Sequence, residues 1–292
     1  MNAIVRISDT EQKAAHIGSL FEDTDAMRRY VPALFATSPH PKMSERYAFT
    51  NTYDILMYLH RLGFRVTSVM GGTSSFNKFM VRMRNTNVDA FNDTAPELVV
   101  LDSHDGSRRL KMLLGAIKFA CLNGLIAGDI MYSRAYTHYN ADLMAKIMLD
   151  LSDLDEHIVT MNKRINDMRN YITTIGERIA LADAAINERY GEKSVSDYAD
   201  MRKNALYIRR TADKSDDLYS VMNVVQENII RGGLTYVNNN RRLQRMRSIG
   251  AVDRNLHINQ RIWLEAERIM TAAAQHDNVI EHMADASDNG EA

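Results

Sequence analysis

The sequence is poor in cysteine, in proline beyond its first third, and in long apolar runs. Its single cysteine, Cys121, cannot form a disulfide within the chain, which fits a reducing cytoplasm. No run of about eighteen apolar residues is present to cross a bilayer, and the N-terminus lacks the apolar segment of a signal peptide. We therefore expect a cytoplasmic protein with no membrane partner.

Motifs of common catalytic and metal-binding sites are also missing. The nine histidines are scattered, and no H-x-x-x-H, C-x-x-C, P-loop or G-x-G-x-x-G motif stands in a suitable context. We therefore predict no cofactor and no metal, and we favour a binding protein over an enzyme. One enzymatic alternative stays open, which is a nucleotide-dependent activity at the adjacent residues His104 and Asp105.

Proline is confined to the part of the chain before residue 97, so the remaining sequence can form long helices. There an apolar residue recurs at alternating steps of four and three, a heptad repeat that predicts a coiled-coil seam on one continuous helix. Fold-back of later segments along this helix is favoured over a homomeric coiled coil. The heptad positions are Ile147, Leu151, Leu154, Ile158, Met161, Ile165, Met168, Ile172, Ile175, Ile179, Ala182 and Ile186.

The N-terminal part shows a mixed pattern. An amphipathic helix is predicted over residues 52–62, and Gly71 and Gly72 are expected to turn the chain after the following strand. Alternating or β-branched runs predict strands at 64–70, 79–84 and 97–101.

These patterns predict an α+β fold class, with a small antiparallel sheet domain, covering helices, and a long coiled-coil-like helical hairpin extension. The expected mixed α+β domain comprises residues 1–140 and the long helical region residues 141–275. Residues 276–292 are acidic and poor in apolar side chains, which predicts a disordered tail.

A polar turn between two apolar runs is the most informative local pattern. Leucines at helical spacing after the turn predict a helix over 107–122, which Ser107 caps and Asn123-Gly124 ends. Backbone N–H groups at such a helix start can bind phosphate, although they can equally serve only as a cap. Basic residues in the expected first turn are Arg108, Arg109 and Lys111. The candidate functional turn comprises Ser103, His104, Asp105 and Gly106, and catalytic, phosphate-binding and structural roles stay open.

The same segment resembles a known family. Ser-His-Asp-Gly-Ser at 103–107, followed by C-x-N-G-L at 121–125, is similar to the signature of domain-of-unknown-function family 932, which phages and plasmids encode. The likeness includes residues 47–56 and, more weakly, residues 218–227. The resemblance implies a phage or plasmid origin, hence a host cytoplasm, and lends no activity. The expected sheet and its covering helix also resemble, in topology alone, Rad52-type single-strand annealing proteins.

Arginine is concentrated late in the chain. Residues 231–270 contain 8 basic residues, all of them arginine, against 3 acidic ones. Arginine pairs phosphates bidentately and stacks on bases, so the cluster beside Tyr236 and Trp263 favours nucleic acid over a solvated face or interhelical ion pairs. The predicted contacts in this cluster are Arg241, Arg242, Arg245 and Arg247.

A second basic group lies on the strand predicted at 79–84. Lys78, Arg82 and Arg84 would face one side of the sheet, because side chains alternate along a strand. Such a face could follow a sugar-phosphate backbone, but an edge strand kept soluble by charge explains it equally well.

The charge pattern predicts a sequence-independent nucleic-acid-binding protein, and the family resemblance implies that a phage encodes it. Single-stranded DNA is the favoured partner, bound or annealed by a homo-oligomer in replication or recombination. The alternative is an interaction protein that binds or inhibits a host factor through its helical hairpin.

Overall fold

The chain divides into two compact units. The sheet unit comprises residues 1–163 and 248–260, and the helical unit comprises residues 164–247 and 261–292. No helix within the described residues has the length and apolar character needed to cross a membrane. The computed structural model describes residues 2–6, 28, 31–85, 94–118, 124–126, 132–138, 143–191, 198–237 and 240–288.

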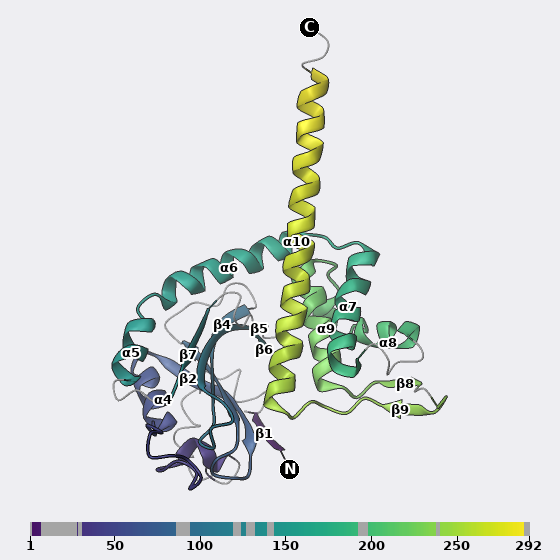
Figure 1. Ribbon diagram of the computed structural model, residues 1–292. Coiled ribbons are helices and arrows are strands. Elements are labelled where there is room, and N and C mark those ends of the chain that lie inside the picture. The colour runs from purple at the N-terminus through teal and green to yellow at the C-terminus, as the bar shows by residue number, and fades with distance from the viewer. Residues whose placement is uncertain are drawn as a thin grey trace. The chain divides into compact units, whose positions relative to one another are not determined.

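The described part of the sheet unit contains a seven-stranded antiparallel sheet (Figure 1). Strands pair in the order β1 to β6, and β7 also pairs with β5. The three predicted strands are confirmed as parts of β2, β3 and β4. The strands are β1 (Asn2–Arg6), β2 (Phe64–Gly72), β3 (Phe79–Asn85), β4 (Thr94–Asp102), β5 (Leu110–Lys118), β6 (Gly124–Ile126) and β7 (Ser133–Tyr136).

The prediction that Gly71 and Gly72 turn the chain is wrong, because both extend β2 and pair with β1. A side chain at Gly71 would not fit, since its Cβ would lie 2.8 Å from Cγ1 of Val31. The glycine therefore permits close packing of the strand against the residue that precedes η1 (Pro32–Phe35).

The predicted helix at 52–62 is confirmed as α4 (Thr52–Arg61). The side chain of Asn51 caps it by accepting a hydrogen bond from the backbone N–H of Tyr53 at 3.0 Å. Helical spacing places Ile55, Leu56 and Leu59 on the buried face, as the amphipathic pattern requires.

The prediction of a helix over residues 107–122 is wrong, because residues 110–118 form the strand β5; residues 119–122 lie outside the described residues. Its residues pair with β4 in continuous register, from Leu101 opposite Lys111 to Thr94 opposite Lys118. Apolar residues lie at consecutive positions 112–114 and again at 116 and 117, and such a pattern suits a strand buried on both faces as well as a helix. Sheet pairing decides between the two, so Ser107 caps no helix and Gly124 begins β6. Cys121 and Asn123 lie outside the described residues.

The single continuous helix predicted for the heptad repeat is also wrong. Three helices take its place: α5 (Leu143–Asp150), α6 (Leu154–Asn170) and α7 (Ile175–Tyr190). A turn at 151–153 makes the first break. At the second break, the backbone N–H of Thr173 donates to the carbonyl of Asp216 at 3.0 Å, and Thr174 begins α7 with a reciprocal capping box to Glu177.

Most heptad positions are nevertheless buried, among them Ile147, Ile165 and Ile186. The exceptions at the second break are Ile172 and Ile175, which are 64% and 74% exposed. The repeat therefore records the buried faces of separate helices, and the seam does not continue across the break.

The helical unit packs α7, α8 (Tyr198–Ala205) and α9 (Leu218–Arg231) against one another, with the short η3 (Thr211–Asp213) beside α9 (Figure 1). Residues 218–230 of α9 are all buried. The last helix is α10 (Val252–Asp288), whose backbone continues through residues 276–288, where composition predicted a disordered tail. Its first turns belong to the sheet unit, where Val252 and Leu256 join a core cluster that includes Met80 and Leu113.

Candidate nucleic-acid interface

The predicted arginine cluster lies on a two-stranded hairpin of the helical unit. Strand β8 (Thr235–Val237) pairs antiparallel with β9 (Leu243–Arg245), with Val237 opposite Leu243 and Thr235 opposite Arg245. The connection includes Arg241, whose φ of 56° is in the left-handed region typical of tight turns. Residues 238 and 239 of the connection lie outside the described residues.

The base of this hairpin is anchored by backbone bonds. The N–H of Gly233 donates to the carbonyl of Met246 at 2.8 Å, and the N–H of Met246 donates to the carbonyl of Leu234 at 2.7 Å. Gly232 has a φ of 68°, and a Cβ there would lie 2.6 Å from the carbonyl oxygen of Met246. Glycine is therefore required at this position both for conformation and for space.

Side chains from α7 and from the segment between α8 and η3 hold the same base. Arg189 of α7 donates to the carbonyls of Ile229 and Arg247, and Arg209 donates to the carbonyl of Gly232 at 2.7 Å. Met246 is 3% exposed and serves as an apolar anchor. The base is thus fixed to α7 and α9, and the arginines beyond it are presented on an ordered support.

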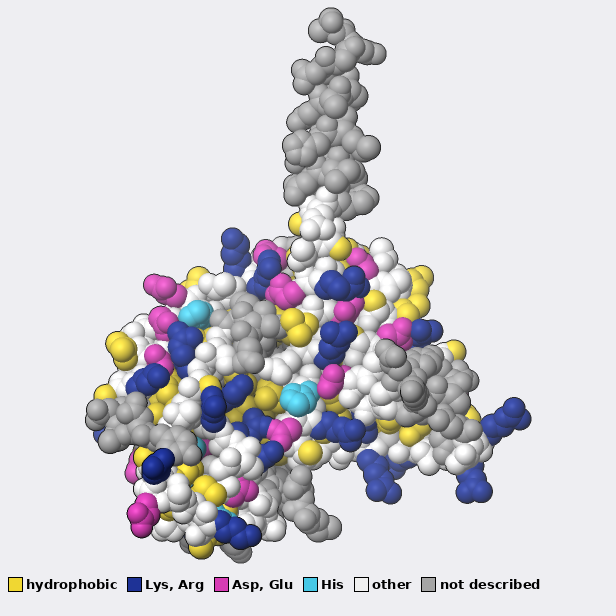
Figure 2. Space-filling model, viewed as in Figure 1, with side chains coloured by type: hydrophobic (Ala, Val, Ile, Leu, Met, Phe, Trp, Pro, Cys, Tyr) yellow, Lys and Arg dark blue, Asp and Glu magenta, His cyan; other side chains and the backbone are white. Residues whose placement is uncertain are grey.

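All four predicted arginines of the hairpin are exposed: Arg241, Arg242, Arg245 and Arg247. Three of them, Arg241, Arg245 and Arg247, form no ion pair with any residue that the structure describes. Figure 2 shows Lys and Arg side chains, in dark blue, projecting at the place that β8 and β9 occupy in Figure 1. Arg245 also donates from Nε to the carbonyl of Gly233 at 3.3 Å, so what these three arginines lack, among the described residues, is a counter-charge.

The two aromatic residues expected beside this cluster have different positions. Tyr236 is half-buried, with its ring centroid 5.6 Å from that of Tyr190 and its hydroxyl donating to Gln244 at 3.0 Å. Trp263 is fully buried in α10, so it is a core residue and cannot stack on a base.

The basic residues predicted on the sheet are placed differently. Arg82 and Arg84 lie on one face of β3, as strand alternation requires, and both pair with Glu97 of β4. Glu97 is completely buried and also accepts a hydrogen bond from Thr67 at 2.9 Å. Because a buried carboxylate needs compensating charge, the two arginines neutralise Glu97.

Lys78 and Arg108 come together on either side of Asp253 in the first turn of α10. The Lys78 Nζ to Asp253 Oδ2 distance is 2.7 Å, and Arg108 pairs with the other carboxylate oxygen. Nearby, Arg109 is exposed and Lys111 is half-buried on β5. A polar pocket of about 340 Å³ adjoins this group, and its lining includes Asp105 and Ser107. Carboxylates are thus already paired with the cations at this pocket.

The turn at 103–107 connects β4 to β5 and is held by hydrogen bonds within the sheet unit; it does not begin a helix. The Ser103 hydroxyl accepts the backbone N–H of Arg108 at 2.9 Å and donates to its carbonyl at 3.2 Å. Asp105 accepts from the backbone N–H of Ser107 at 2.9 Å, and hydrogen bonds from Ser107 lower the pKa of Asp105 although burial alone would raise it. Gly106 completes the turn with a φ of 74°.

His104 is completely buried between the rings of Phe49 and Phe79, whose centroids lie 5.0 and 5.8 Å away. Burial lowers the pKa of His104, against the opposing effect of the Asp102 charge. Its backbone ties the turn down, since the N–H donates to the carbonyl of Phe76 at 3.1 Å. This geometry favours a structural histidine, because the ring has no access to solvent.

The neighbouring Asp102 organises a buried polar network that the sequence pattern did not reveal. Its carboxylate accepts from the Thr52 hydroxyl at 2.6 Å and from the backbone N–H of Ser103 at 2.8 Å, and it contacts Nε2 of His138 at 3.0 Å. The ring of Tyr47 stacks on His138 with centroids 4.8 Å apart. The network joins β4, α4 and the loop after β7. Only the position of Asp102 at a strand end could have signalled it.

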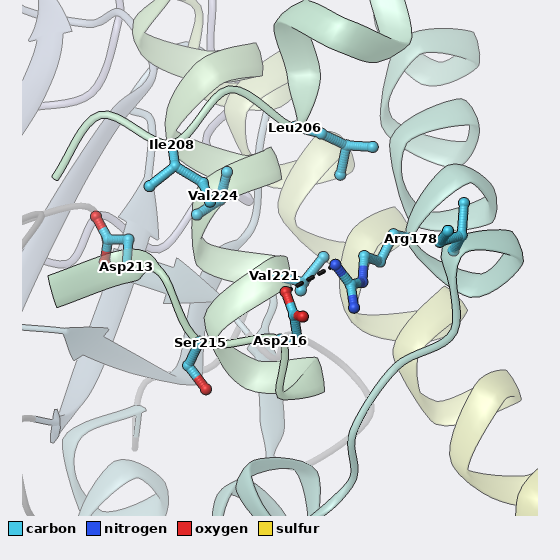
Figure 3. A pocket seen from close by; sticks show the side chains of 9 residues that line it. Arg178, Leu206, Ile208, Asp213, Ser215, Asp216, Val221 and Val224 are labelled. Atoms are coloured by element: carbon cyan, nitrogen blue, oxygen red, sulfur yellow. Dashed lines mark ion pairs between the residues drawn. The ribbon is translucent and has the colours of Figure 1, made fainter. Parts of the chain in front are cut away.

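A second pocket, the helix pocket, lies in the helical unit and encloses about 210 Å³ (Figure 3). Arg178 and Asp216 point toward each other there, joined by an ion pair of 2.7 Å. Its remaining lining is mostly aliphatic: Ile175, Leu206, Ile208, Val221 and Val224, with Asp213 and Ser215. Within the described residues, no group of three or more His, Cys, Asp or Glu side chains could hold a metal ion.

The chain matches one family model and is similar to two proteins of Escherichia coli K12. A family model described as "Domain of unknown function (DUF932)" matches residues 39–263, which confirms the resemblance carried by the turn at 103–107. Two proteins of Escherichia coli K12 are similar over 250 residues, the UPF0380 protein YafZ at 28% identity and the UPF0380 protein YfjQ at 27%. Each match covers 83% of this chain and 89% of the relative. No solved structure matches the chain.

Proposed function

The chain belongs to the family of the domain of unknown function DUF932, and we propose that it binds nucleic acid without sequence specificity through the β8–β9 hairpin. Single-stranded DNA is the favoured partner. A phage or plasmid protein of this kind would act on DNA in the host cytoplasm, in replication or recombination.

One observation carries the proposal: Arg241, Arg245 and Arg247 are exposed on an anchored hairpin and form no ion pair with a described residue. Other arginines that the sequence predicted as nucleic-acid contacts, Arg82 and Arg84, instead neutralise the buried carboxylate of Glu97. An exposed guanidinium without an ion pair to a described carboxylate is available to a phosphate, which it can bind bidentately. Contacts of this kind position a nucleic acid and carry no sequence information.

The experiment replaces Arg241, Arg245 and Arg247 together by Ala and measures binding of labelled single-stranded oligonucleotides across a salt series. We expect weaker binding of every sequence, and a salt slope reduced by about 2, because each lost phosphate contact removes about 0.7 from the slope for single strands. The matched control replaces three exposed basic residues of the sheet unit, Lys42, Arg46 and Arg61.

The control removes the same charge and should leave affinity within about twofold, because long-range effects of net charge are screened at physiological salt. Equal losses in both triple variants would mean that only net charge matters. An unchanged slope in the hairpin variant would remove the hairpin from the interface.

The helix pocket favours a second candidate function, which is a protein-interaction surface that supports a homo-oligomer. Ile175 is 74% exposed, and Tyr207 and Ile208 are 55% and 42% exposed, so apolar area surrounds the pocket. Light scattering of the Ile175→Ser, Ile208→Ser double variant should then report a lower mass than that of the original chain. A chain that is monomeric before any substitution would contradict this candidate.

A further inference from the structure

The exposed end of the β8–β9 hairpin carries a large apolar side chain among arginines. Leu243 is 72% exposed, although it lies in the regular part of β9. Residues 241–247 read Arg-Arg-Leu-Gln-Arg-Met-Arg and contain no acidic residue. Isolated exposed leucines are ordinary, so exposure alone means little. The informative feature is that this leucine is surrounded by exposed positive charge.

The register of the hairpin assigns Leu243 to one face. Side chains alternate along a strand, so Leu243 and Arg245 share a face, together with Val237 and Thr235 opposite them. The opposite face carries Tyr236 and Gln244, which are hydrogen-bonded to each other. One face of the ribbon therefore combines an apolar end, Leu243 with Val237, and a cation nearer its base, Arg245.

We propose that Leu243 packs against unstacked bases, so that the hairpin binds single strands by base contact as well as by phosphate contact. This inference rests on the proposed function and names the substrate class of the same site. Charge complementarity selects the occupant, because a strand offers an anionic backbone and apolar base faces at neighbouring positions.

Duplex DNA offers less to the same surface. A two-stranded ribbon fits the major groove, which is about 12 Å wide, but base faces there are covered by stacking. The arginines can still reach the phosphates of a duplex, whereas Leu243 reaches only base edges. Binding to single strands should therefore exceed binding to duplex by the contribution of Leu243.

The experiment compares Leu243→Ser with Leu149→Ser by oligonucleotide anisotropy on single-stranded and duplex DNA. Leu149 is 71% exposed on α5 of the sheet unit, so the two substitutions are matched in chemistry and exposure. We expect Leu243→Ser to weaken single-strand binding about five- to tenfold, the low end of what the loss of one aromatic–base stack costs, because leucine offers apolar contact without a ring. Its salt slope should stay unchanged, because no phosphate contact is removed.

Leu149→Ser should leave binding unchanged. Leu243→Phe should bind single strands at least as tightly as the original chain, because an aromatic ring stacks on a base. A 2-aminopurine base placed in the single strand should change fluorescence on binding to the original chain and less so with Leu243→Ser. Circular dichroism of the variants confirms that the fold is retained.

Each of the following outcomes overturns the inference. Unchanged single-strand affinity in Leu243→Ser excludes base contact by this side chain, and equal losses on single strands and duplex exclude the proposed strand preference. Competition by polyglutamate as strong as that by an oligonucleotide of equal charge would assign the surface to an acidic polypeptide. If the original chain binds no oligonucleotide, the proposed function itself fails. If only the arginine variant weakens binding, the function stands and the role of Leu243 falls.

Discussion

Nε of Arg82 lies 2.9 Å from Oε2 of Glu97, whose side chain is completely buried between strands of the sheet. Arg84 pairs with the other carboxylate oxygen at 3.2 Å. A basic strand that could have faced nucleic acid is thus an internal charge cluster. This relationship separates arginines that hold the fold together from those of the hairpin, and it can be tested directly.

Replacing Glu97 by Gln should destabilise the sheet unit, because Arg82 and Arg84 would remain in a largely buried position without the opposing charge. Removal of one partner of a buried ion pair costs about 3–5 kcal/mol. Urea unfolding followed by circular dichroism measures the free energy of unfolding. A loss within about 0.5 kcal/mol, as for ordinary surface substitutions, would show that Glu97 is not the required counter-charge.

The free energy of unfolding should fall as the pH drops below neutrality, because burial lowers the pKa of His104. In the unfolded chain a histidine takes up its proton near pH 6.5, whereas in the fold it does so only at a lower pH. The unfolded state therefore binds more protons between these two values, and stability declines there by up to about 1.4 kcal/mol per pH unit.

Chemical unfolding at a series of pH values from 7.5 to about 5 tests this dependence. The His104→Leu variant should show a flatter profile, and the exposed His257 provides the control as His257→Gln. A profile of His104→Leu as steep as that of the original chain would assign the acid sensitivity to another group.

The break between α6 and α7 predicts opposite outcomes for two heptad isoleucines. Ile165 is 1% exposed and Ile172 is 64% exposed. Ile165→Ser should lower the free energy of unfolding by about 3 kcal/mol through the cavity and the buried hydroxyl, whereas Ile172→Ser should change it by under about 0.5 kcal/mol. Thermal or urea unfolding compares them. Similar losses of the free energy of unfolding in both variants would indicate a continuous buried seam and contradict the break.

Gly232→Ala should damage the hairpin, since the position has a φ of 68° and its Cβ would meet the Met246 carbonyl at 2.6 Å. We expect a loss of at least about 1 kcal/mol and weaker oligonucleotide binding, because the arginines lose their support. Gly176 in α7 is the matched control, as its nearest Cβ neighbour would lie 3.9 Å away. Gly176→Ala should be neutral or stabilising by about 0.5–1 kcal/mol and should leave binding intact. A Gly232→Ala variant as stable as the control would contradict the anchoring.

Local sequence patterns predicted the secondary structure correctly where a pattern was compatible with only one kind of element. The strand at 64–70 and the helix at 52–62 carry clear alternation or helical spacing, and both are present. The run 110–118 has apolar residues on both faces of a strand as well as at helical spacing, so its sequence is compatible with two structures. Antiparallel pairing with β4, the strand that precedes it, decided in favour of a strand, and the helix start considered at Ser107 disappeared with that decision.

The heptad repeat shows a different limit. Its periodicity correctly marked buried positions such as Met161 and Ala182, but it could not reveal that Thr173 bonds to Asp216. The candidate site divides in the same way. Clustering of arginine in the sequence marked side chains that the structure shows exposed, whereas the pairing of Arg82 and Arg84 with Glu97 became apparent only through strand register.

The central claim is that the chain binds single strands through charge and without sequence preference. The most direct measurement is anisotropy of the original chain with single-stranded oligonucleotides of about 30 nucleotides and differing composition, each titrated across a salt series beside its duplex. The account predicts affinities that agree among sequences, fall steeply with salt, and exceed those for the duplexes. Absence of binding at low salt, or binding confined to one sequence and insensitive to salt, would contradict it.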